Sequence, residues 1–136
     1  MPRYVAVIDE KYGVYGVTIP DLPGCTASGK TIDQAHRSLI EAVAVWVRDA
    51  ATAGKKLPKP RTLEQLYKDA DVAGAIAKGG ALIVVPVLRD YGRSIKANLS
   101  LDAGLLDAID EAADAHGLTR SSFMATAARE KIRRGT

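Results

Sequence analysis

The chain has 136 residues, of which 47% are hydrophobic and 26% charged, and its formal net charge is +3. This length suits one modest domain or two small ones, and the composition is typical of a soluble globular protein. Its longest apolar run, residues 81–88, is far too short to span a membrane, and no signal-peptide pattern precedes the first predicted strand. One cysteine excludes an internal disulfide framework, and with two histidines it argues against structural zinc. We therefore expect a cytoplasmic protein without metal or cofactor.

The chain begins with a pattern that predicts three strands. Arg3–Asp9 is apolar enough for a strand buried on both faces, and Val14–Ile19 predicts a second strand that pairs with it as a hairpin. Two prolines and a glycine in Pro20–Cys25 stop the pairing and fix a bend. Cys25–Ser28 is then a candidate for a short third strand.

A long amphipathic helix follows. Thr31 and Gln34 have the spacing of a capping box, and Gly54 is suited to the position after the helix end. The helical spacing of its apolar residues predicts one buried stripe, formed by Ile32, Ala35, Leu39, Val43, Trp46, Val47 and Ala50. Trp46 is also a candidate for partner contact, although its place on this stripe favours the core.

Residues 55–62 hold two prolines and four basic side chains, which indicates an exposed connector. Leu63–Ala70 and Val72–Ala77 predict one or two short helices with a break near Asp71. Ala81–Leu88 is a fourth strand, and Pro86 places part of it at a sheet edge or at its end. The helix must cover one face of the sheet, so residues 1–89 predict an α+β domain of order β-β-β-α-β.

The last third of the chain, residues 90–136, combines three patterns. Polar and apolar residues alternate from Ser94 to Leu101, which predicts a half-buried strand. A helical stripe follows and ends at Gly117, and Thr119 is a cap for a second helix. The stripe of the first helix is formed by Leu101, Leu105, Ile109, Ala112 and Ala113, and that of the second by Phe123, Met124, Ala127, Ala128 and Ile132.

One strand and two helices are too little to close a core alone, and the strand has two unpaired edges. A second copy of the chain solves both problems, because two strands pair antiparallel while four helices cover their apolar face. We predict this dimer core from Ile95, Leu99, Leu101, Leu105, Ile109, Phe123, Met124 and Ala127. The ribbon then presents Lys96 and Asn98 outward, and such a ribbon fits the DNA major groove.

This segment resembles the ribbon-helix-helix DNA-binding family in the order and spacing of its parts and in its GLTRSSF junction. The resemblance implies that Lys96 and Asn98, with Ser94 at the margin, contact bases. It also implies that backbone amides around Arg120 and Ser121, after the Thr119 cap, bind a phosphate; helix N-termini are anion sites. A helical hairpin used only for dimerisation is the alternative.

The charges are unevenly distributed. Residues 1–89 hold twelve Lys and Arg against nine Asp and Glu, whereas residues 90–136 hold seven of each. Five acids of the second segment lie on its first helix, which we expect to face away from DNA: Asp102, Asp107, Asp110, Glu111 and Asp114.

Nearly the whole chain resembles the HicB-type antitoxins. The resemblance rests on RYVAVID, on the PDLPGC turn followed by G-x-T-x-x-x-A at Gly29–Ala35, on GALIVVPV and on the ribbon-helix-helix segment. It implies a partial RNase H-like N-terminal domain and a small RNA-cleaving toxin partner of the HicA type. It also implies repression of the shared operon by binding to operator DNA as a homodimer, with a tetramer left open. A stand-alone regulator, whose first domain senses a ligand or oligomerises, is the alternative.

An RNase H-like fold raises the question of catalysis by converging carboxylates and two metal ions. Asp9, Asp21, Asp33 and Glu41 are the candidates. Asp9 is the last residue of a predicted strand, and none of the four lies in the interior of one, where such a cluster is usually anchored. Cys25 with His36 has no third orienting residue, and a small buried cysteine is favoured. We therefore expect no enzyme and no catalytic residue.

The toxin-binding surface is the least determined feature. A toxin that binds RNA should be basic, so its inhibitor is expected to offer acids or to cover the active site by shape. Glu10, Asp21, Leu22 and Pro23 are candidates through their expected exposure, with a purely structural turn as the alternative.

Overall fold

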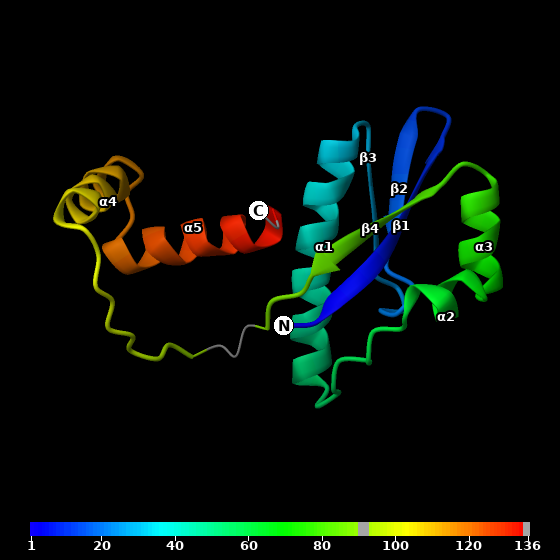
Figure 1. Cartoon of the computed structure of the whole chain (residues 1–136), viewed down its shortest axis with the longest axis horizontal. Helices are drawn as coiled ribbons and strands as arrows, with labels where there is room; N and C mark the ends of the chain where they lie inside the picture. The colour runs from blue at the N-terminus through cyan, green and yellow to red at the C-terminus, as the bar shows by residue number, and fades with distance from the viewer. Residues whose placement is uncertain (90–92, 135–136) are drawn as a thin grey trace. The chain divides into compact units, whose positions relative to one another are not determined.

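The computed structural model describes residues 1–89 and 93–134 (Figure 1). The chain divides between residues 91 and 92 into two compact units, called here unit 1 (described residues 1–89) and unit 2 (described residues 93–134). The linker expected at Arg89–Arg93 falls mostly outside the described residues. Within the two described ranges, no helix has the length and apolar character that crossing a membrane requires.

Unit 1 contains a four-stranded antiparallel sheet of order β3-β2-β1-β4. Its strands are β1 (Arg3–Lys11), β2 (Val14–Thr18), β3 (Thr26–Gly29) and β4 (Ala81–Pro86). The predicted hairpin, third strand and edge strand are all present, with boundaries shifted by one or two residues. β4 ends at Pro86 and not at Leu88. The Val87 amide still donates to the Pro2 carbonyl at 2.9 Å, but Pro2 has no amide to return a hydrogen bond.

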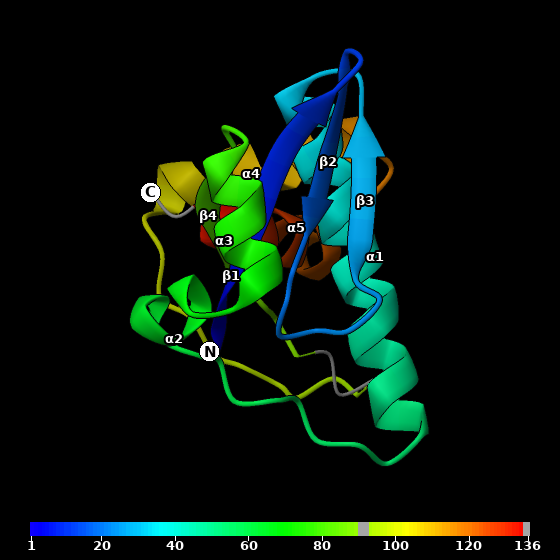
Figure 2. The same cartoon turned by 90° about the vertical axis from the view of Figure 1, so that its right-hand side faces the viewer.

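The helix α1 (Ile32–Thr52) covers one face of this sheet, as Figure 2 shows, and confirms the α+β prediction. The core between them is formed by Tyr4, Ala6, Val17, Ile19, Leu22, Cys25, Ala35, Leu39, Val43, Val47, Val85 and Val87. Thr31 caps α1 by accepting from the Gln34 amide at 3.1 Å. The capping box is incomplete, because the Gln34 side chain accepts from the amide of Lys30 instead of Thr31. Ile32 is exposed, so the predicted stripe begins at Ala35.

The opposite face of the sheet is only partly covered, by α3 (Ala70–Ala77), which follows the single turn α2 (Leu63–Tyr67) (Figures 1 and 2). Leu66 and Val72 are the buried residues of these two helices. The break between them lies at Lys68–Asp69 and not near Asp71, because Asp69 caps α3 by accepting from the amides of Asp71 and Val72.

This partial cover corrects the prediction that β1 is buried on both faces. Tyr4 and Ala6 face α1 and are fully buried, whereas Val5 and Val7, on the other face, are half-buried. An apolar strand sequence by itself does not distinguish a covered face from a half-covered one.

Unit 2 consists of α4 (Ala103–Ala115) and α5 (Arg120–Arg134) after an extended segment. Asp102 caps α4, and Gly117 has the left-handed φ of +67° predicted for the residue after the helix end. Residues 93–102 form no strand in the single chain. A strand is defined by pairing, and unit 2 offers no partner strand within the described residues, so the predicted ribbon remains a prediction.

Candidate DNA-binding and partner surfaces

The predicted dimer core of unit 2 is an uncovered apolar surface in the single chain. Ile95 is 79% exposed, Leu99 65% and Leu105 51%, values far above those of ordinary core residues. The remaining predicted core residues are exposed or half-buried: Leu101, Ile109, Phe123, Met124 and Ala127. The structure therefore brings these residues into one small unit without giving them a complete core.

The extended segment before α4 keeps the alternation predicted for it. Ala97, Leu99 and Leu101 line a cavity of about 290 Å³ together with residues at the start of α5, including Ser121 and Met124. The polar residues between and before them, Ser94, Lys96 and Asn98, are exposed and take no part in that lining. One side of the segment thus faces helices and the other faces solvent.

The start of α5 has the features of an anion site. The Thr119 hydroxyl accepts from the amide of Ser122 at 3.1 Å and donates to its hydroxyl at 2.9 Å, which confirms the cap. Among the described residues, the amides of Arg120 and Ser121 donate to no acceptor, as expected for the first positions of a helix. Two unpaired amides at the positive end of the helix dipole are available for a phosphate.

The guanidinium of Arg120 is engaged elsewhere. Its Nε and its Nη2 each donate to one carboxylate oxygen of Asp110 on α4, both at 2.8 Å. These hydrogen bonds hold the pKa of Asp110 below its usual value. Arg120 therefore joins the two helices of unit 2, and its backbone amide is the part left for a ligand.

The PDLPGC turn is a structural element, which corrects two candidate toxin contacts. Leu22 is fully buried in the core and Asp21 is 8% exposed, so the exposure expected of both is wrong. Asp21 accepts from the amide of Arg61 at 2.8 Å and from its Nε at 2.5 Å. The cause is the connector after α1, which returns along the turn and supplies Arg61 as the partner of the buried carboxylate.

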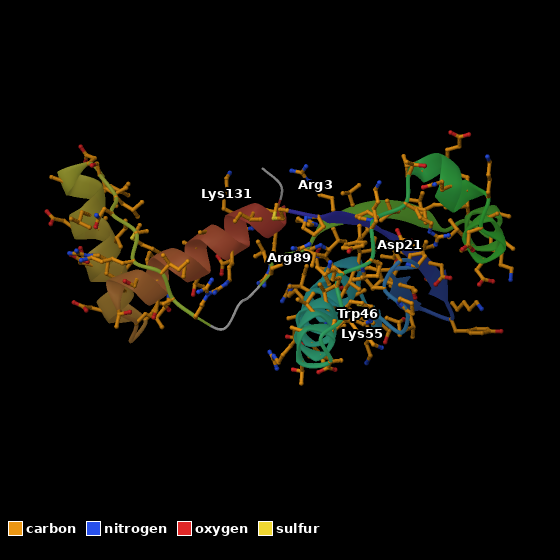
Figure 3. All side chains as sticks on the ribbon, turned by 90° about the horizontal axis from the view of Figure 1, so that it is seen from below. Arg3, Asp21, Trp46, Lys55, Arg89 and Lys131 are labelled. Atoms are coloured by element: carbon orange, nitrogen blue, oxygen red, sulfur yellow. The ribbon has the colours of Figure 1, made fainter. Side chains whose placement is uncertain are left out.

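Glu10 and Pro23 are exposed as expected. The Pro23 carbonyl accepts from the indole Nε1 of Trp46 at 2.8 Å, so the half-buried Trp46 joins α1 to the turn. Trp46 and Asp21 are labelled in Figure 3. This bond supports the structural interpretation of Trp46.

A cavity of about 560 Å³ lies between α3 and the less covered face of the sheet. Asp9, Asp69 and Asp71 contribute to its lining. Asp9 lies inside β1, because this strand continues to Lys11, two residues beyond its predicted end. Asp69 is committed to capping α3 and to Arg61. No group of three His, Cys, Asp or Glu side chains that suits a metal ion occurs in residues 1–89 and 93–134.

Cys25 is buried in the core of unit 1, and this burial raises the pKa of its thiol. A raised pKa lowers the thiolate fraction at neutral pH and with it the nucleophilicity of the sulfur. Cys25 is thus a core residue, as predicted.

These observations define a class: a two-unit α+β protein, with a sheet packed on a long helix and a small helical unit whose apolar surface is left open. A family model described as "HicB_like antitoxin of bacterial toxin-antitoxin system" matches residues 4–128. The chain belongs to this HicB-like antitoxin family, which is non-enzymatic.

Solved structures of this family resemble the chain. The antitoxin HicB of Burkholderia pseudomallei is 29% identical, with full coverage of both chains and a TM-score of 0.54. A chain of a HicA3–HicB3 toxin–antitoxin complex is 24% identical, with a TM-score of 0.51 over 62% of this chain and 96% of that one, which shows the fold alone. An uncharacterised 14.9 kDa protein of Haemophilus phage HP1 is 26% identical over 95% of this chain and 96% of its own length.

Proposed function

We propose that this protein is a cytoplasmic antitoxin with two separate tasks. Unit 1, as a partial RNase H-like domain, sequesters a small HicA-type ribonuclease toxin by covering it, without chemistry. Unit 2 forms a homodimer of ribbon-helix-helix type that binds an inverted-repeat operator and represses the operon of the pair.

The observation that carries the DNA-binding part is the uncovered apolar surface of unit 2, together with the polar side of the segment before α4. Residues such as Ile95 and Leu99 gain a core when a second copy pairs with the segment. The same pairing places two copies of Lys96 and Asn98 on one ribbon, opposite the helices. The unpaired amides at the start of α5 then supply phosphate contacts on each side.

Family membership supports the toxin-binding part. The similar HicA3–HicB3 structure is described as a toxin–antitoxin complex, and its matched chain corresponds to 62% of this chain. Asp9, Asp69 and Asp71 line the cavity on the less covered face of the sheet. A toxin that binds RNA is expected to be basic, and such acids suit a basic partner.

Co-purification tests the toxin partner. The tagged chain is expressed from its native operon with the neighbouring genes, and proteins that elute with it at stoichiometric yield are identified. We expect a short basic protein that cleaves RNA only after release from this chain. Elution of the chain alone, as a dimer or tetramer that binds DNA, contradicts the antitoxin proposal and supports a stand-alone regulator, for which the unit 1 cavity is the candidate ligand site.

The base-contacting residues are tested with the double variant Lys96→Ala, Asn98→Ala. We expect loss of preference for the operator over a scrambled duplex, about 1–3 kcal/mol for each bidentate base contact removed. Sedimentation equilibrium should show an intact dimer, because both side chains lie on the solvent side of the segment. An unchanged operator preference of the double variant would contradict the assignment of this segment as a DNA-binding ribbon.

A further inference from the structure

A second surface, on unit 1, concentrates positive charge. A cavity of about 480 Å³ at the C-terminal end of α1 has an apolar floor of Val47, Ala50, Ala51 and Leu57, and its remaining lining residues are all basic: Lys55, Lys56 and Arg89. Figure 3 looks onto this end of α1 and labels Lys55 and Arg89. We call these three side chains the basic end of unit 1.

Several local contacts hold the basic end in place. The amide of Lys55 donates to the Ala50 carbonyl at 2.8 Å, which closes the end of α1. The Tyr4 hydroxyl donates to the carbonyl of Pro58, three residues after Lys55. Burial raises the pKa of Tyr4, the charge of Arg89 opposes that rise and the charge of Asp21 adds to it. The cations therefore come from two distant parts of the sequence and meet at one rim.

Among residues 1–89 and 93–134, no acid balances this rim. The cavity lining includes no Asp or Glu, and Asp49, on the last turns of α1, forms no ion pair with Lys55 or Lys56 within the described residues. Lys55 and Lys56 are exposed. Uncompensated, exposed cations in a group are the usual contact for the phosphate backbone of DNA.

The position of this surface in the chain favours DNA over other polyanions. Arg89 precedes Ser94, the first residue of the predicted ribbon, by five residues, and five residues span at most about 18 Å. Residues 90–136 have no net charge, whereas the positive charge of the chain lies in residues 1–89. The length of the connection therefore limits how far Arg89 can lie from the start of the ribbon, whatever the arrangement of the two units.

We propose that the basic end of unit 1 is a second DNA contact, which binds backbone phosphates beside each operator half-site and adds affinity without sequence preference. This inference rests on the DNA-binding function proposed above, but it concerns a different unit and a different kind of contact.

The test compares Lys55→Gln, Lys56→Gln with a control of equal charge change, Lys30→Gln, Lys78→Gln, whose exposed lysines lie outside this cavity. Affinity of the full-length chain for operator and scrambled duplexes is measured between 0.05 and 0.3 M salt. Each lost phosphate contact lowers the slope of log affinity against log salt by about 0.9, so one contact per protomer of a dimer lowers it by roughly 2. At 0.1 M salt we expect affinity for both duplexes to fall by the same factor, on the order of tenfold or more.

The outcomes separate this inference from its alternatives. A lower slope on both duplexes, with an unchanged control, supports the second contact. If the Lys55→Gln, Lys56→Gln variant keeps the wild-type slope, the second contact is overturned. A lower unfolding temperature of that variant does not rescue it, because cations at a helix C-terminus also stabilise the helix dipole. An unchanged slope with weakened binding of single-stranded RNA or of a protein partner overturns it and assigns the surface to that partner.

Failure of the ribbon proposal gives a different experimental result from failure of the second DNA contact. Wild-type protein without operator preference contradicts base contact by Lys96 and Asn98, while the slope on the scrambled duplex still decides whether the basic end binds phosphates. A chain that binds neither duplex overturns both proposals.

Discussion

At the scale of single residues, Arg61 connects three parts of unit 1 that are distant in sequence. Its backbone amide and its Nε donate to Asp21 in the PDLPGC turn, and its Nη1 lies 3.2 Å from an oxygen of Asp69, the cap of α3. The Asp21 side chain is 5% exposed and that of Arg61 35%. A carboxylate this deeply buried needs its cation, because an uncompensated buried charge is strongly destabilising.

Arg61→Met retains the aliphatic length of the side chain and removes its charge. We expect a loss of about 2 kcal/mol in the free energy of unfolding, below the usual cost of breaking a buried ion pair because Arg61 is partly exposed. Urea unfolding of the variant and the wild type measures it. The matched control is Lys68→Met: its side chain is 76% exposed and that of its partner Glu64 82%, so the midpoint should stay unchanged. Equal midpoints for all three proteins would contradict this role of Arg61.

Asp110 gives unit 2 a dependence on pH. Its hydrogen bonds from Arg120 hold its pKa below the value of an unfolded chain, so its contribution to stability is present above about pH 4. That contribution is lost as the pH falls through the pKa of the folded state. Asp110→Asn should therefore unfold at a lower temperature than the wild type at pH 7, and the difference should be smaller at pH 3. A difference that is the same at both pH values argues against this ion pair.

At the scale of elements, the G-x-T-x-x-x-A pattern records the close packing of β3 against α1. A Cβ at Gly29 would lie 2.5 Å from the amide nitrogen of Ala35, and 2.8 Å from atoms of Gln34. Ala35 itself is fully buried. The two small residues thus let a strand end pass directly over the first turn of the helix, and Thr31 caps the helix between them.

Gly29→Ala should destabilise unit 1 by about 1–3 kcal/mol, the usual cost of overpacking, because backbone atoms and not a flexible side chain stand in the way. Gly74→Ala is the control, for which we expect a change in stability of the opposite sign. Gly74 lies inside α3 with nothing within 4 Å of the new Cβ, so alanine should stabilise by roughly 0.5–1 kcal/mol. Thermal unfolding of both variants measures these changes. Two unfolding temperatures that shift in the same direction would contradict this packing argument.

At the scale of the whole molecule, the two units have different degrees of self-sufficiency. Unit 1 closes a core of twelve buried residues between a sheet and a helix. In unit 2, among the described residues, Ala113 alone is buried, and the large apolar side chains remain open to solvent. We therefore infer that unit 2 reaches its full stability only in an assembly, and that its stability depends on protein concentration.

Leu99→Asp should abolish the dimer, because pairing would bury two carboxylates without partners, which costs several kcal/mol. We expect a monomer in sedimentation at micromolar concentration, with operator binding lost and toxin binding retained by unit 1. Ser100→Asp is the matched control, because it adds the same charge on the alternate, polar side and should remain a dimer. A dimeric Leu99→Asp protein would show that the apolar surface of unit 2 is not the interface.

The sequence predicted most elements because their signals are local. Helical spacing, the Thr31 and Thr119 caps and the glycines after α1 and α4 depend on neighbouring residues, and the structure confirms them. The strand predicted from the period-two pattern of Ser94–Leu101 remains a prediction. The break between α2 and α3 was wrong by two residues, since Asp69 and Asp71 are equally plausible caps until the chain is folded.

The interactions between distant segments could not be predicted from the sequence. The burial of Asp21 and Leu22 depends on a connector forty residues later, and a turn with two prolines is normally exposed. In the same way, Lys55 and Arg89 line one cavity only because the segment after β4 returns to the end of α1. No spacing rule joins such residues.

The sequence by itself determined the order of the elements, the alternation of the segment before α4 and the family, because these depend on short-range pattern. Only the tertiary structure decided which acids are buried, how far each sheet face is covered and where the free cations gather. Burial and charge compensation are sums over neighbours from the whole fold, so they exist only once distant segments are packed together.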